Sequence, residues 1–194
     1  MGEKSHVPNL AVLQDVGSST IREIEQLIAS GDTGGLRLVG AYWTPDQGCL
    51  FSVFEGEGSA PRLAGAGSAD IFPVLPITAE EYGPPAMDPA AGSGERLQLV
   101  LVRRHLEPMT HPEFRAVALQ AIMCAHEYTD MRWLRSYWAT EQNELHCLFR
   151  TRTHDLVREH ARRSRIPCDE VHDAVEVTSI DAPRPSAAGG GVRA

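Results

Sequence analysis

Histidine is concentrated in the second half of the chain, where three of the four cysteines also lie. Seven of the eight histidines follow residue 100. Imidazole and thiolate are the usual protein ligands of borderline cations such as nickel and zinc. His105, Cys147 and His160 come from three separate predicted elements that can pack together. The sequence therefore predicts a site for Ni(II) or Zn(II) formed by these three residues.

His146 directly precedes Cys147, but neighbouring residues of a strand point to opposite faces, so the two cannot both reach one metal without a bulge. The metal-ligating residues also have a purely structural interpretation. A buried cysteine behaves as a small hydrophobic residue, and a histidine on the inner face of a helix can simply be hydrogen-bonded in the core. Both interpretations stay open at this point.

A second set of residues suits a small organic ligand. Trp133, Arg135 and Tyr137 combine aromatic surface with a cation on one predicted strand, and His146 lies on the next. Apolar walls with a few polar groups are typical of sites for small molecules, here planar or anionic ones. The alternative to a metal-binding protein is thus a small-molecule-binding protein or enzyme with a pocket between two sheets. A third hypothesis is an interaction module without chemistry.

Familiar catalytic signatures are absent from the sequence. It contains no GxxxxGK[ST], GxSxG or HExxH pattern, which are the marks of common phosphate-binding, hydrolase and metalloprotease sites. Catalytic residues therefore stay undetermined.

Periodicity predicts the elements that position these residues. Leu99 and Leu101 alternate with Val100 and Val102, so the first strand of the second half is buried on both faces. The predicted elements are a strand Leu97–His105, a helix from Pro112 to about Tyr128, strands Met131–Trp138 and Glu144–Arg150, a helix capped by Thr153, and a strand Val171–Ile180.

This order of elements predicts an α+β fold with a ferredoxin-like βαββαβ unit. Tyr42 and Trp43 recur as Tyr137 and Trp138, an offset of 95 residues, which indicates two such units. Their antiparallel sheets are expected to pack as an intramolecular pseudo-dimer, an α/β barrel. The competing arrangement is domain swapping between chains. The predicted parts are a divergent unit at 8–80, a Pro/Gly/Ala-rich linker at 81–95, a second unit at 96–181 and a disordered tail at 182–194.

Composition limits the classes of partner. The 194 residues carry a net charge of -8, which argues against nucleic acid because its phosphates attract positive surfaces. No apolar stretch is long enough to span a membrane, and the start of the chain resembles no signal peptide. We expect a cytoplasmic protein whose cysteines are thiols. Association of two chains into a homodimer is compatible with the sequence.

Four motifs in order carry a family resemblance. They are VRRHL at 102–106, WLRSY at 133–137, HCLF at 146–149, and REHARR at 158–163 followed by Ile166 and Pro167. The second unit resembles a small bacterial family of ferredoxin-like domains that includes a nickel-binding actinobacterial member. The resemblance implies the fold and a metal, but no established reaction. Many members have histidine where this chain has Arg135, so a ligand supplied by that histidine would be missing here.

Overall fold

The computed structural model describes residues 9–62, 68–78 and 97–177. Nine strands form one antiparallel sheet in the order β8-β5-β7-β6-β4-β1-β3-β2-β9. The elements are β1 (Asn9–Asp15), α1 (Ile21–Ser30), β2 (Arg37–Thr44), β3 (Cys49–Glu55), β4 (Ala69–Thr78), β5 (Gln98–His105), α3 (His111–Ala125), β6 (Met131–Ala139), β7 (Glu144–Thr151), α4 (His154–Ser164), β8 (Glu170–Asp173) and β9 (Val175–Glu176).

Each of the two units contributes four strands to the sheet in the same order. In the second unit the fourth strand lies beside the first, followed by the third and the second, which gives β8-β5-β7-β6. The first unit has the matching order β4-β1-β3-β2. Both are the order of a ferredoxin-like unit, so the predicted α+β fold class is confirmed. This order is also what a tandem pair predicts.

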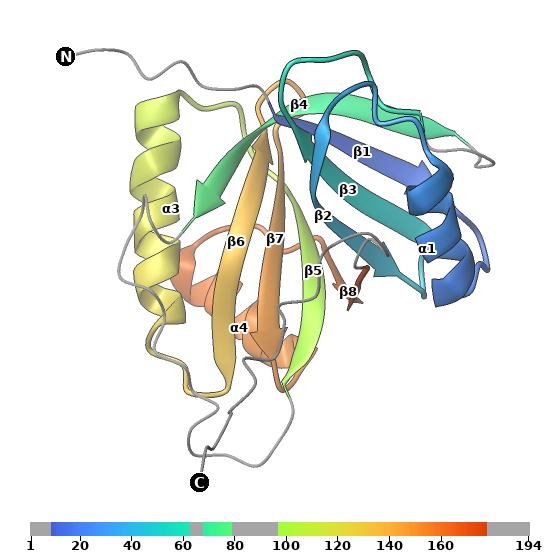
Figure 1. Cartoon of the computed structure of the whole chain (residues 1–194). Coiled ribbons are helices and arrows are strands. Elements are labelled where there is room, and N and C mark those ends of the chain that lie inside the picture. The colour runs from blue at the N-terminus through green and yellow to red at the C-terminus, as the bar shows by residue number, and fades with distance from the viewer. Residues whose placement is uncertain (1–8, 63–67, 79–96, 178–194) are drawn as a thin grey trace, which may run out of the picture.

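Two further pairings join the units. β4 of the first unit pairs with β6, and β9 pairs with β2. Only Ala174 separates β8 from β9, so the chain runs directly from one end of the sheet to the other. The sheet thereby curves into a nearly closed barrel. Figure 1 shows α3 and α4 outside the β5–β7 part of this barrel, and α1 outside the β1–β3 part.

The strands of the second unit are buried on both faces, as their alternation predicts. Val100 and Val102 belong to a core cluster that also contains Phe114 of α3 and Val157 of α4. Leu99 and Leu101 belong instead to a cluster inside the barrel, shared with the first unit.

Aromatic rings fill the middle of the barrel. The rings of Phe51 on β3 and His146 on β7 stack with their centroids 4.6 Å apart. Tyr137 of the second unit also packs on Phe51 of the first unit, with the ring centroids 5.8 Å apart. The offset of 95 residues that relates Tyr42 to Tyr137 also relates Phe51 to His146, so the stacked pair lies where equivalent strands of the two units face each other.

Capping residues set the ends of the two helices that cover the second unit, α3 and α4. Thr110 and Glu113 form a capping box at the start of α3, with Pro112 in its first turn. Thr153 accepts a hydrogen bond from the backbone N–H of Leu156 at the start of α4. The helix α4 ends at Ser164 because the next residue, Arg165, is left-handed with φ 56°. No helix in the described residues is long and apolar enough to cross a membrane.

The structure differs from the predicted elements in two places. Between β3 and β4, the described residues 56–62 and 68 contain no helix, so the second helix of the first βαββαβ pattern is not found there. The predicted final strand is two strands, because β8 pairs with β5 while β9 pairs with β2. All of the predicted linker and all of the predicted tail fall outside the described residues, so the four predicted parts and their boundaries stay predictions.

Candidate functional site

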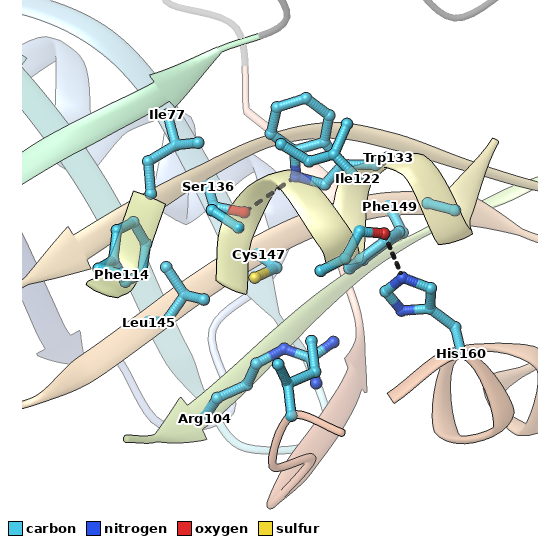
Figure 2. A pocket seen from close by; sticks show the side chains of 14 residues that line it. Ile77, Arg104, Phe114, Ile122, Trp133, Ser136, Leu145, Cys147, Phe149 and His160 are labelled. Atoms are coloured by element: carbon cyan, nitrogen blue, oxygen red, sulfur yellow. Dashed lines mark hydrogen bonds between the residues drawn. The ribbon is translucent and has the colours of Figure 1, made fainter. Parts of the chain in front are cut away.

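A small cavity lies between the outer face of the second unit's sheet and the helices α3 and α4, with Ile77 of β4 in its wall. Its volume is about 30 Å³, room for about two water molecules. Apolar side chains form most of its wall, including Ile77, Phe114, Ile122, Trp133, Leu145 and Phe149. Four polar side chains also line it, and Figure 2 shows them converging from three strands and α4: Arg104, Ser136, Cys147 and His160.

Arg104 contributes a fully buried guanidinium from the end of β5. Its side chain is 0% exposed, and Nη1 donates a hydrogen bond to the backbone carbonyl of Pro167. Its Nε and Nη2 are buried and have no hydrogen-bond partner among the described residues. A guanidinium is always charged in proteins, so an incompletely paired one in the interior carries a substantial desolvation penalty.

His160 contributes a neutral imidazole from α4. Its Nε2 lies 2.8 Å from the backbone oxygen of Ala121, and because a carbonyl only accepts, Nε2 must hold the proton. Burial lowers the pKa of His160 to about 4, and Arg104 and Arg163 add to this effect. The ring is therefore neutral at pH 7, and its Nδ1 is an acceptor without a partner in the described structure.

Cys147 and Ser136 complete the polar part of the cavity. Cys147 is 4% exposed on the helix-facing side of β7. The hydroxyl oxygen of Ser136 accepts a hydrogen bond from Trp133 Nε1 at 2.9 Å, which leaves the hydroxyl proton for another acceptor. The cavity thus offers hydrogen-bond donors on Arg104 and Ser136 and an acceptor on His160.

The three predicted metal ligands do not meet. Cys147 and His160 line the cavity, whereas His105 lies next to Arg104 on β5 and points to the other face. Its Nε2 is 3.1 Å from Glu144 and its Nδ1 is 3.5 Å from Asp169, with the side chain 55% exposed.

The described residues do not form a complete nickel or zinc site. They contain no group of three or more histidine, cysteine, aspartate and glutamate side chains placed to hold a metal. The permanent charge of Arg104 also opposes a cation in the cavity.

The predicted ligand-binding residues are divided between two faces of the sheet. Trp133 lines the helix-side cavity. Tyr137 and His146 are register partners on β6 and β7 and lie inside the barrel. Arg135 is half-buried near Tyr42 and Tyr137. Burial raises the pKa of Tyr42 well above its ordinary value, so Tyr42 adds a hydroxyl group and no charge to the inside of the barrel.

A second polar cluster lies at the end of the barrel where β5 finishes and β7 begins. Arg103 holds both carboxylate oxygens of Glu144, through Nε at 3.0 Å and Nη2 at 2.6 Å. Hydrogen bonding from His146, with further help from Arg103, lowers the pKa of Glu144 to about 2. His172 on β8 lies 2.7 Å from Asp46 of the first unit. Of these contacts, the one between His172 and Asp46 joins the two units at this end.

Sequence reasoning missed Arg104, although a signal for it is present. Arg104 follows Val100 and Val102 at every second position of β5, and these valines face the helices. An arginine that continues a buried apolar face is unusual, so it points to a buried site.

A search of curated proteins gives no match. A crystal structure of a Fusobacterium nucleatum protein described as a candidate monooxygenase is similar to this chain, with 11% identity and a TM-score of 0.45 over 90% of this chain and 94% of that one. The model of the family described as nickel responsive protein, SCO4226-like, matches residues 101–173. This match agrees with the resemblance carried by the four motifs, all of which lie within the matched residues, so residues 101–173 are similar to an SCO4226-like domain.

Proposed function

We propose that the chain binds a small molecule in the cavity between the sheet of the second unit and its helices. The observation that carries this proposal is the pair of buried, incompletely bonded polar groups, Arg104 and His160, in one apolar-walled space. Buried polar groups are normally satisfied by protein or water, so two unsatisfied groups at one cavity indicate a partner that binds there.

The proposed site differs from the pocket between two sheets that the sequence suggested. The interior of the barrel is occupied by the stacked rings of Phe51 and His146, which Tyr137 adjoins. The cavity lies instead on the helix side of the sheet, mostly within the second unit. At about 30 Å³ it accepts a ligand of a few heavy atoms without rearrangement.

Binding of nickel or a similar divalent cation is the second candidate function. The match of residues 101–173 to a family described as nickel responsive favours it. Cys147 and the free Nδ1 of His160 are the two groups that a metal in this cavity would meet. Arg104 opposes it there, which is why we place it second.

Thermal denaturation with a panel of solutes tests both candidates. We expect at least one solute of a few heavy atoms to raise the melting temperature of the wild-type chain saturably, because a ligand that prefers the folded state stabilises it. Ni(II) and Zn(II) are included in the panel. A shift with Ni(II) that is lost in a Cys147→Ala, His160→Ala variant would favour the second candidate.

A matched pair of substitutions on β7 locates the binding. Cys147→Met adds atoms on the cavity side and is expected to abolish the shift. Leu148→Met changes the neighbouring residue, which is 0% exposed inside the barrel, and preserves its approximate volume, so it should keep the shift. Equal responses of the two variants would place the ligand somewhere other than this cavity.

A further inference from the structure

We infer that the cavity is a site for a small oxyanion such as formate or hydrogen carbonate, held by the unpaired edge of Arg104. This inference rests on the proposed function and assigns the chemical class of the ligand. The two unpaired nitrogens, Nε and Nη2, lie on the same edge of the guanidinium, and Nη1 is already used by the carbonyl of Pro167. This edge therefore presents two parallel N–H donors.

The neighbouring arginine shows what this edge binds in the same protein. Arg103 uses the corresponding atoms, Nε and Nη2, to hold the two oxygens of Glu144 at 3.0 Å and 2.6 Å. Two parallel N–H donors match a planar group with two oxygens. Arg103 and Arg104 point to opposite faces of β5, so only Arg103 has access to Glu144. An oxyanion in the cavity would give Arg104 the equivalent partner.

The charge of the cavity also favours an anion. No aspartate or glutamate is among its lining residues, and His160 is neutral at pH 7 because burial lowers its pKa to about 4. The guanidinium of Arg104 is thus the one formal charge among the described residues that line the cavity. A monoanion would neutralise it, whereas a cation would add a second positive charge.

The hydrogen-bond acceptor on His160 further limits which oxyanions suit the cavity. Its unpaired Nδ1 needs a hydrogen-bond donor, which a fully deprotonated oxyanion lacks. Hydrogen carbonate keeps one hydroxyl proton and can supply that donor itself. Formate is smaller and would leave room for a water molecule beside His160. The volume of about 30 Å³ excludes large acids unless the surrounding side chains move.

The test measures the melting temperature of the wild-type chain in formate, hydrogen carbonate and nitrate, against chloride at equal ionic strength. Formamide is added as an uncharged molecule of nearly the same size as formate. We expect a saturable upward shift with formate or hydrogen carbonate, and none with formamide. Arg104→Met should lose this shift, while Arg103→Met, which changes the adjacent residue on the other face, should keep it.

The outcomes separate this inference from the proposed function. A shift with formamide and none with the oxyanions would overturn the oxyanion and preserve a small-molecule cavity. No shift with any solute would overturn both. An Arg104→Met variant that keeps the formate shift would also refute the assignment. Should that variant not fold, the titration of ¹³C-labelled formate with the wild-type chain decides: saturable line broadening supports the site, and its absence refutes it.

Discussion

Acidification should destabilise this protein through His160, in a pH range that identifies the residue. The imidazole is 1% exposed and its pKa falls from 6.5 to about 4 in the folded chain. The unfolded chain binds the proton first as the pH falls, so protonation favours unfolding. The loss of stability begins near pH 6.5 and is complete near pH 4. At pH 5 these two pKa values correspond to a loss of about 2 kcal/mol.

Urea denaturation at pH 7 and pH 5 measures this loss. We expect His160→Gln to remove it, because glutamine stays neutral and its amide can donate to the carbonyl oxygen of Ala121 in place of Nε2. The buffer should contain no carboxylate, since a small oxyanion bound beside Arg104 would favour the protonated ring. Piperazine and chloride meet this requirement.

The control substitution is His126→Gln, which removes a histidine from the exposed end of α3. It should retain the full difference between pH 7 and pH 5. If His160→Gln and the wild-type chain lose the same free energy on acidification, the reasoning about the buried neutral imidazole is refuted.

Three further predictions concern the contacts around the site and the closure of the barrel. Glu144→Gln should remove a second loss of stability that occurs between pH 4.5 and about 2, because the contacts that lower the pKa of Glu144 stabilise the fold only while its carboxylate is charged. Urea midpoints across that pH range measure this loss, and an unchanged profile in the variant would contradict the prediction. Trp133→Phe should cost about 1 kcal/mol by leaving the buried Ser136 without its donor, and a double-mutant cycle with Ser136→Ala should show coupling of similar size by urea unfolding. Truncation after Asp173 removes β9 and exposes the edge of β2, so sedimentation should show self-association that a chain ending at Val177 does not show.

The sequence predicts much of this fold because its apolar pattern is unambiguous. The alternation in β5 requires two buried faces, and the structure provides helices for one and the other unit for the second. Thr153 marks the start of α4 as expected. The split of the final strand was not predictable, because it depends on which edge is free in each unit. A local pattern contains no information about pairing partners so distant in the chain.

The candidate site is harder to predict, because it depends on which face each residue occupies. Cys147 and His160 were expected to approach each other and do line one cavity. The sequence predicts His105 as the third ligand from its residue type, yet His105 is one position away from the face of β5 that reaches the cavity. A shift of one residue in a strand reverses the direction of the side chain, so Arg104 occupies the place where a third ligand was expected.

The two consecutive arginines of β5 explain why we expect an anion in this cavity. The strand β5 places Arg103 at a barrel end rich in carboxylates and histidines. It places Arg104 at an apolar cavity that no aspartate or glutamate lines. Arg103 already has a carboxylate partner, while two nitrogens of Arg104 have none in the described structure. Burying such a charge lowers stability unless a partner arrives. Because the cavity is small, at about 30 Å³, a small partner fits it best. The same residue that opposes nickel there would select an oxyanion.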